Sequence, residues 1–246
     1  MRKLWRDSNH RLNNVLMSDI RTILYQIESH KPPTVPTFAL RSLQIVSGGY
    51  GEGDMFYGIP VPLLRKIAKH HCSVSLEICE KLLQHPLHEA RYTALVLLCE
   101  KFYRSPQAVL DIYLKNTRHV NNWDLVDLSA PHIVGAFCLQ TSNNDVIRNL
   151  AHSEKLWENR IAVVATLPLI KSHKFELTFE LCEHFLHHPH PLIHKACGWM
   201  LREISKRDAE SVLRFFRRHP DAPSAMRGYA LEWVRKREKI MKNKSF

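Results

Sequence analysis

The stretch HEARYTALVLL (88–98) decides the fold, because two later stretches repeat its spacing of apolar and basic residues. These are WENRIAVVATL (157–167) and IHKACGWMLRE (193–203), and each has a basic residue near the start of an apolar helix. The equivalent basic positions lie 69 and then 35 residues apart. Such intervals correspond to two units and then one unit of a helical-pair repeat, a period typical of helical solenoids.

The remainder of the chain also reads as helix. Apolar residues recur at three- and four-residue spacing almost throughout, without a convincing alternation of period two. Breaks are predicted at clusters of helix-breaking residues: Pro32-Pro33, Ser47 to Gly53, Pro60 with Pro62, His85-Pro86, Ser105-Pro106, Ser142 to Asn144, His187 to Pro191, and His219 to Pro223. The sequence therefore predicts an all-α fold, a curved solenoid of paired helices.

We expect a single domain over residues 1–246, with an N-terminal helix region at 1–35 and a basic C-terminal end at 235–246. The C-terminal end reads as a solvated tail that adds nonspecific affinity at most. A chain of this length can bury its own core.

Charge favours a polyanionic partner. Lysine and arginine number 35 against 24 aspartates and glutamates, which gives a net charge of +11. If Arg91, Arg160 and Lys195 hold the same place in their repeats, the concave wall of the solenoid carries a basic groove that could follow a phosphate backbone. The alternative is a chance alignment of residues that form ordinary ion pairs.

Neither a metal site nor a membrane segment is predicted. Five histidines lie near Cys182, but prolines interrupt the cluster and its spacing matches no tetrahedral pattern; they are His184, His187, His188, His190 and His194. The six cysteines lie singly in apolar stretches, which is typical of reduced, buried thiols. No apolar segment is long enough to span a bilayer, so we expect a cytoplasmic protein. From the histidine and cysteine spacing we expect no metal, and we expect no cofactor.

The segment NNWDLVD (121–127) crowds an indole and two carboxylates into one short helix. Trp123 and Asp127 are four residues apart and therefore project from the same face, whereas Asp124 points elsewhere and is expected to be structural. Asn121 or Asn122 could cap the helix. Composition alone favours a structural role, with Trp123 as a core anchor and Asp127 as the partner of a neighbouring arginine.

Four separated motifs in the same order resemble the AlkD-like DNA alkylation repair family, HEAT-like repeat glycosylases that act on alkylated purines. They are FYGIPVPLLRKIAK (56–69), NNWDLVDLSAPHIVG (121–135), LWENRIAVVAT (156–166) and KACGWMLREISKRD (195–208). The resemblance covers about residues 38–229.

The resemblance assigns a role to four residues. Asp127 matches the family's catalytic carboxylate, Trp123 and Trp199 match its paired aromatic residues, and Arg160 matches its catalytic-site arginine near the DNA backbone. Arg91 and Lys195 are weaker candidates for phosphate contacts. The closing helix departs from the pattern, since Ser224 and Gly228 stand where relatives often carry arginine.

The resemblance implies a monofunctional DNA glycosylase. It would excise N3- and N7-alkylated purines, such as 3-methyladenine and 7-methylguanine, from double-stranded DNA by hydrolysis of the N-glycosidic bond, without base flipping. We expect a nucleoid-associated monomer. Two other functions stay open: a non-catalytic paralogue that binds damaged or branched DNA, and a protein-interaction scaffold.

Overall fold

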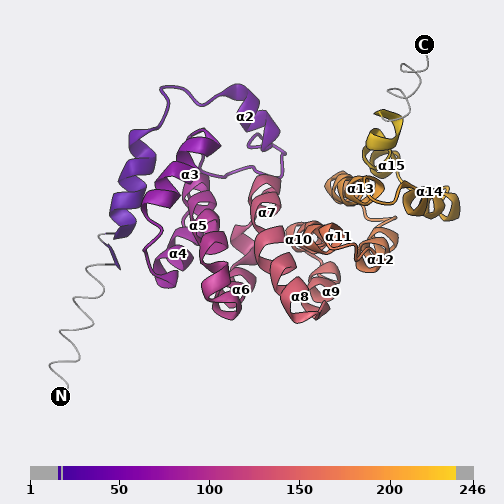
Figure 1. Cartoon of the computed structure of the whole chain (residues 1–246). Helices are drawn as coiled ribbons and strands as arrows, with labels where there is room; N and C mark the ends of the chain where they lie inside the picture. The colour runs from indigo at the N-terminus through magenta and orange to yellow at the C-terminus, as the bar shows by residue number, and fades with distance from the viewer. Residues whose placement is uncertain (1–15, 18, 237–246) are drawn as a thin grey trace, which may run out of the picture. The chain divides into compact units, whose positions relative to one another are not determined.

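The structure, a computed structural model, describes residues 16–17 and 19–236 (Figure 1). Within these residues all regular elements are helical, and the sole strand-like feature is an isolated bridge between Met55 and Leu87. The predicted all-α class is therefore confirmed. The curvature of the array and its concave basic groove stay predictions. Most of the predicted basic end at 235–246 lies outside the described residues.

The chain divides into two compact units, Met1–Ser129 and Ala130–Phe246. The described part of the first unit begins with helical residues at 16–17 and 19–29. Its further elements are α2 (Thr37–Ser42), α3 (Val61–His70), α4 (Leu76–Leu83), α5 (His88–Lys101), a 3-10 turn η1 (Phe102–Arg104), α6 (Pro106–Lys115), a second 3-10 turn η2 (Thr117–His119) and α7 (Trp123–Ser129).

Helix α5 forms the centre of the first unit. Every residue from His88 to Leu98 is buried, and α3, α4, α6 and α7 all pack against this helix. The burial includes three basic or acidic side chains, His88, Glu89 and Arg91. Charged groups are rarely buried unless they are paired, so these three side chains require partners on neighbouring segments.

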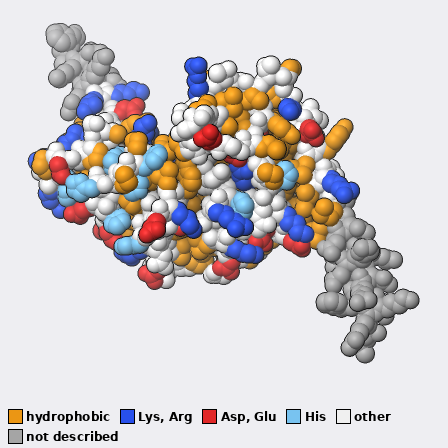
Figure 2. All heavy atoms as spheres, turned by 180° about the vertical axis from the view of Figure 1, so that it is seen from behind, with side chains coloured by type: hydrophobic (Ala, Val, Ile, Leu, Met, Phe, Trp, Pro, Cys, Tyr) orange, Lys and Arg blue, Asp and Glu red, His pale blue; other side chains and the backbone are white. Residues whose placement is uncertain are grey.

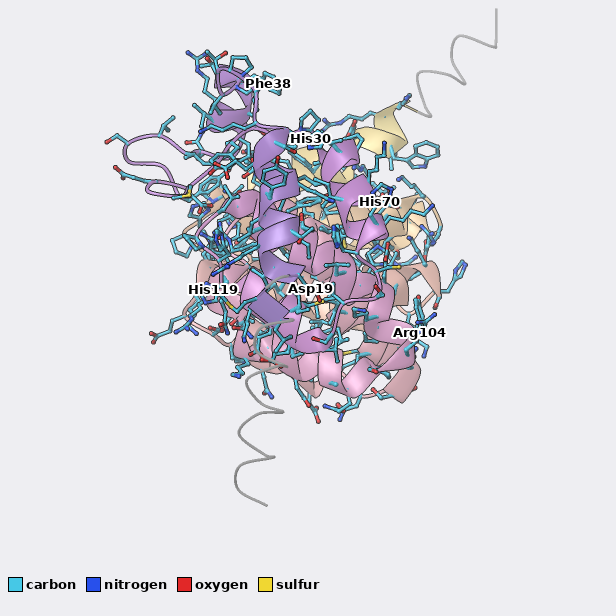
Figure 3. All side chains as sticks on the ribbon, turned by 90° about the vertical axis from the view of Figure 1, so that its left-hand side faces the viewer. Asp19, His30, Phe38, His70, Arg104 and His119 are labelled. Carbon is cyan, nitrogen blue, oxygen red and sulfur yellow. The ribbon has the colours of Figure 1, made fainter. Side chains whose placement is uncertain are left out.

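Helix α2 is the most exposed element of the first unit, since it has no buried residue. Phe38 on this helix is directed away from the helical body and is 76% exposed (Figure 3). The segment between α2 and α3 contains three glycines with positive φ, of which Gly58 approaches Pro36 so closely that a Cβ would clash. This segment leads the chain back to the start of α5, where the Met55 carbonyl accepts from the His88 backbone N–H.

The described part of the second unit contains a π-helical turn, η3 (Pro131–Gly135), and eight helices: α8 (Ala136–Thr141), α9 (Asp145–Ala151), α10 (Leu156–Val164), α11 (Leu167–Lys171), α12 (Glu176–His184), α13 (Pro191–Ser205), α14 (Ala209–Arg218) and α15 (Ser224–Ala230). A short helical stretch at 232–236 follows them. Helix α13 lies at the centre of this unit, in contact with α10, α11, α12, α14 and α15.

The predicted helix breaks agree with these bounds. The Ser105-Pro106 and His190-Pro191 pairs lie at the starts of α6 and α13, where proline at the first position supplies a compatible φ and loses no helical hydrogen bond. The three repeated stretches lie in α5, α10 and α13, as their spacing predicted. No described helix is long and apolar enough to cross a membrane.

Candidate active site

Helix α7 carries the aromatic–carboxylate pair and starts at a side-chain cap. The Asn122 Oδ1 accepts from the Trp123 backbone N–H at 2.8 Å, and the Asn122 carbonyl accepts from the Val126 N–H at 3.1 Å. The Asn122 carboxamide is fully buried and also donates to the Leu43 carbonyl at 2.9 Å. Of the two predicted caps, the structure therefore uses Asn122, which also joins α7 to the end of α2.

Trp123 and Asp127 both lie on α7, one helical turn apart, and both are half-buried. The Trp123 indole N–H donates to the Ser42 carbonyl at 3.0 Å, which fixes the orientation of the ring. Each side chain keeps part of its surface open to solvent. The two residues therefore share a helix face that a ligand can reach, with the indole held in place by α2.

Asp124 points to a different set of partners. Its Oδ2 lies 2.8 Å from the His88 Nε2, while the His88 Nδ1 lies 3.2 Å from the Asp54 Oδ2. Asp54 in turn accepts from the Arg91 Nη2 through both of its oxygens, at 2.6 Å each. The expectation that Asp124 is structural agrees with this geometry, since its carboxylate belongs to a buried chain of four charged groups.

The environment of these groups shifts two pKa values. Burial opposes protonation of His88, but hydrogen bonds to Asp124 and Asp54 outweigh it and raise the pKa of His88 to about 9. Burial also opposes ionisation of Asp54, but the hydrogen bond from His88 and the charge of Arg91 outweigh it and hold the pKa of Asp54 below its ordinary value. At neutral pH the network therefore contains an imidazolium, a guanidinium and ionised Asp54.

Arg91 was predicted to contact phosphate, but its surroundings favour a structural role. The residue is 3% exposed, and its Nη1 donates to the His85 and Pro86 carbonyls at 3.1 and 2.7 Å while its Nη2 is bound to Asp54. A guanidinium with these partners is not available to a DNA backbone without breaking a buried ion pair. Arg91 therefore finds no support as a DNA contact.

The second unit holds the other predicted residues on two helices that pack together, α10 and α13. Arg160 on α10 is 6% exposed, and its Nη1 donates to the Leu192 carbonyl in the first turn of α13 at 2.8 Å. Lys195 lies on α13 and is exposed. Of the three aligned basic residues, Lys195 alone has an open surface, so the shared register of the repeats did not give them a shared exposure.

Trp199 is half-buried on α13 and follows Gly198, where α15 packs closely against α13. A Cβ added at Gly198 would lie 2.6 Å from the Met226 carbonyl oxygen and 2.7 Å from the Tyr229 Cβ. Only glycine permits this contact. The glycine of the Gly-Trp motif therefore sets the distance between two helices next to the predicted aromatic residue.

The structure thus brings Trp123 and Asp127 together on one helix of the first unit, and Arg160, Lys195 and Trp199 together on a helix pair of the second. Sequence reasoning missed His88, Asp54 and the anchor role of Asn122. The sequence contains little signal for them, because the partners of His88 lie 34 and 36 residues away along the chain.

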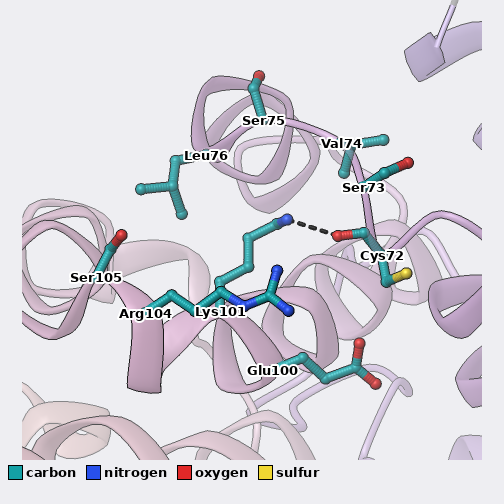
Figure 4. Close-up of a pocket in the computed structure, with 9 residues that line it drawn as sticks. All are labelled: Cys72, Ser73, Val74, Ser75, Leu76, Glu100, Lys101, Arg104 and Ser105. Atoms are coloured by element: carbon teal, nitrogen blue, oxygen red, sulfur yellow. Dashed lines mark hydrogen bonds between the residues drawn. The ribbon is translucent and has the colours of Figure 1, made fainter.

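A separate cavity of about 450 Å³ lies in the first unit, and none of the predicted residues lines it. It is lined by side chains at the starts of α4 and α6 and the end of α5 (Figure 4): Cys72, Ser73, Val74, Ser75, Leu76, Glu100, Lys101, Arg104 and Ser105. The Lys101 ammonium donates to the Cys72 carbonyl at 2.7 Å. One of the two cationic groups that line the cavity is therefore already engaged by a backbone carbonyl.

Histidine side chains gather on the surface of the second unit (Figure 2), where the rings of His152 and His184 lie 5.0 Å apart. Burial lowers the pKa values of His188, His190 and His194, so these rings are neutral at physiological pH. No group of three or more histidine, cysteine or carboxylate side chains in the described part of the chain is arranged to hold a metal ion.

The fold and these residues define an all-helical protein with an indole–carboxylate pair on one accessible helix face. Comparison with known sequences gives the family: residues 34–234 match the DNA alkylation repair enzyme family. The match covers most of the chain, which therefore belongs to that family. No curated protein matches the chain.

A solved structure supports the fold assignment. It is described as a predicted DNA alkylation repair enzyme from Enterococcus faecalis, and it matches with a TM-score of 0.66 at 18% sequence identity. The match covers 79% of this chain and 95% of that chain. At this identity the similarity concerns the fold alone.

Proposed function

We propose that this protein is a monofunctional DNA glycosylase that removes N3- and N7-alkylated purines from double-stranded DNA. The observation that carries the proposal is the pair formed by Trp123 and Asp127, both partly exposed on one face of α7, in a chain of the DNA alkylation repair enzyme family. The reaction is hydrolysis of the N-glycosidic bond, and its product is an abasic site.

Hydrolysis of the N-glycosidic bond of an alkylated purine needs only one catalytic carboxylate. Alkylation at N3 or N7 gives the purine a formal positive charge, so the base leaves as a neutral molecule and does not need a strong general acid. The remaining deoxyribose has oxocarbenium character, which the Asp127 carboxylate would stabilise while it positions or deprotonates a water. Asp124 is already engaged by His88 and is not required as a second catalytic acid.

The two tryptophans suit a cationic sugar. The face of an indole attracts positive charge, and a partly desolvated cation–π contact contributes on the order of 1–2 kcal/mol. The Ser42 carbonyl holds the Trp123 ring by its N–H, which leaves the ring face free to meet a substrate. The resemblance pairs Trp199 with Trp123 as the second aromatic residue. A contact made to sugar and backbone fits the resemblance, which implies excision without base flipping.

Backbone contacts are assigned to Arg160 and Lys195. Lys195 has the open surface that a phosphate contact requires, and Arg160 is anchored to the first turn of α13 through Leu192. Such contacts set the register of the duplex and read no sequence. Arg91 is left out of the proposed interface because it is buried against Asp54. No metal or cofactor is needed by the proposed mechanism.

Base release from methylated duplex DNA tests the proposal. We expect the wild-type protein to release 7-methylguanine or 3-methyladenine without nicking the strand. Asp127→Asn should keep its affinity for the duplex but lose about a hundredfold or more in excision rate. Asp111→Asn is the matched control, since it removes the same charge from an exposed site on α6 and should leave excision unchanged.

Other outcomes separate the alternative functions. Wild-type protein that binds methylated or branched DNA in a salt-dependent manner, yet releases no base, would be a non-catalytic DNA-binding paralogue. DNA affinity that is absent or independent of salt would instead favour a protein-interaction scaffold, because phosphate contacts release counterions and give a steep salt dependence. An unaltered rate for Asp127→Asn would remove that residue from the mechanism.

A further inference from the structure

The His88 imidazole is held between two carboxylates in the interior of the first unit. Its Nδ1 lies 3.2 Å from the Asp54 Oδ2 and its Nε2 lies 2.8 Å from the Asp124 Oδ2, and the residue is 2% exposed. The edge-on Phe56 ring lies 5.5 Å from the imidazole, measured between centroids. Both ring nitrogens therefore face acceptors, and water has no access to either.

This geometry requires a protonated ring. A neutral imidazole has one N–H, so one of its nitrogens would turn a lone pair toward a carboxylate oxygen, whereas an imidazolium donates to both. The charges agree with this assignment. The carboxylates of Asp54 and Asp124 are balanced by the Arg91 guanidinium and the His88 imidazolium, and a neutral ring would leave one buried negative charge uncompensated.

The network joins two segments that are distant in sequence. Asp54 belongs to the segment between α2 and α3, which is further held by Glu89, whose Oε1 accepts from the backbone N–H groups of residues 57, 58 and 59 at 2.9, 2.7 and 3.2 Å. Asp124 lies in the first turn of α7, between Trp123 and Asp127. Because α7 has only seven residues, a tie in its first turn affects the position of the whole helix.

We infer that His88 is a positioning residue: as an imidazolium between Asp54 and Asp124 it fixes the rotation of α7, and through α7 the places of Trp123 and Asp127. The consequence for excision rests on the proposed function. The hydrogen-bonded link between His88 and α7 does not rest on the proposed function, because this link is a property of the folded protein alone.

Three charged groups act on His88. They are Asp54 from the α2–α3 segment, Asp124 from α7 and Arg91 from α5 itself; His85 and His119 face Arg91 in turn. Burial lowers the pKa of His85, and the Arg91 charge lowers it further. The pKa of His119 is lowered by burial, then by the charge of Arg118 and then by that of Arg91, so both histidines are neutral in the alkaline range. Among the three histidines at this place, a midpoint between pH 7 and 10 therefore belongs to His88.

The Trp123 indole N–H gives a reporter that needs no substrate, because its hydrogen bond to the Ser42 carbonyl places it at the α7 surface. We would follow the indole resonances of the full chain by NMR from pH 6 to 10 and assign Trp123 with the variant Trp123→Phe. The Trp123 signal should move with a midpoint near 9, together with the His88 ring signals. In Asp124→Asn the midpoint should fall by one unit or more, and in His88→Gln the movement should vanish.

His70→Gln is the matched control, because His70 is exposed on α3 and outside the network. It should reproduce the wild-type titration. A Trp123 signal that stays unchanged while His88 titrates, or a His88 midpoint at or below 7, would overturn the inference. If His88→Gln does not fold, Asp124→Asn decides the matter by its shifted midpoint, since an amide keeps the shape and an acceptor of the carboxylate.

Excision kinetics form the second arm. His88→Gln should lower the excision rate roughly ten- to a hundredfold, the effect expected from misplaced catalytic groups, with less than a twofold change in duplex affinity. The wild-type rate should fall above about pH 9 and the variant should lack that limb. Equal rates and pH profiles would refute the positioning role. If the wild-type protein releases no base, the proposed function fails, whereas the NMR titration still decides the tie.

Discussion

Replacing Gly198 with alanine should destabilise the protein through a single added methyl group. The new Cβ would lie 2.6 Å from the Met226 carbonyl oxygen and 2.7 Å from the Tyr229 Cβ. Ordinary contact begins at 3.4 Å, so the overlaps are 3.4 − 2.6 = 0.8 Å and 3.4 − 2.7 = 0.7 Å. Neither neighbour is the end of a flexible side chain. Helices α13 and α15 must therefore separate, and overpacking of this kind costs about 1–3 kcal/mol.

Gly228→Ala provides the matched control. Gly228 lies inside α15, and a Cβ added there meets nothing within 4 Å. Both substitutions gain the same helix propensity, about 1 kcal/mol for glycine to alanine. The gain therefore cancels when the two variants are compared, and the difference in their free energies of unfolding isolates the overpacking cost. We expect Gly228→Ala to be more stable than Gly198→Ala by about 1–3 kcal/mol.

Urea denaturation followed by far-ultraviolet circular dichroism measures this difference, with the m-value unchanged as the sign of a simple stability effect. The melting temperatures of the two variants should differ by about 2–4 °C for each kcal/mol in a chain of this size. Two variants of equal stability would show that α13 and α15 do not approach each other at Gly198, and the reason given for the Gly-Trp motif would be wrong.

Three further predictions concern buried ionisable groups. Glu89→Gln removes the charge from a carboxylate that accepts from three backbone N–H groups, so it should cost about 2–3 kcal/mol in unfolding free energy and speed proteolysis of the 44–58 segment. Cys72 is exposed, whereas burial raises the pKa of Cys99 to about 12; a thiol reagent at pH 8 should modify Cys72 first, and Cys72→Ser should abolish the fast phase. The folded state raises the pKa of His88 to about 9, so the stability that protonated His88 contributes is complete below its ordinary pKa and is lost as pH rises through 9. The unfolding free energy of the wild type should therefore fall by up to about 3 kcal/mol across that window. His88→Gln should not show this fall.

Local pattern was enough to predict most of the helices. Proline and the short polar residues mark the starts of α4, α6 and α13 with a physical reason, since each caps a helix or fits its first turn. The turn after α11 escaped prediction. There His173 takes a positive φ of 59°, a conformation that the sequence would have signalled only with glycine or asparagine.

The sequence was enough to predict which helix positions the candidate site residues occupy, but not their burial or their partners. Spacing four residues apart was sufficient to place Trp123 and Asp127 on one face of α7, because helix geometry is local. Repeat register also placed Arg91 and Arg160 in equivalent helices, but it could not predict that both side chains would be buried. Burial depends on what packs over a position, and for Arg91 that is Asp54, which lies 37 residues away.

The buried charges beneath α7 are a poor means of gaining stability. Ion pairs in an interior lose most of their Coulombic gain to desolvation, and apolar replacements of similar volume are often as stable or more so. What an apolar cluster lacks is direction, because dispersion contacts tolerate a helix that rotates by several degrees. Hydrogen bonds from one imidazolium to Asp54 and Asp124 tolerate far less, since both ring nitrogens must stay in line with their acceptors. If excision needs the Asp127 carboxylate to stay aligned with a reacting sugar, a rigid α7 offsets the desolvation cost of the buried charges. His88 should then affect the excision rate more strongly than an apolar core residue of equal burial, such as Leu95. Truncation of Leu95 should act mainly on stability.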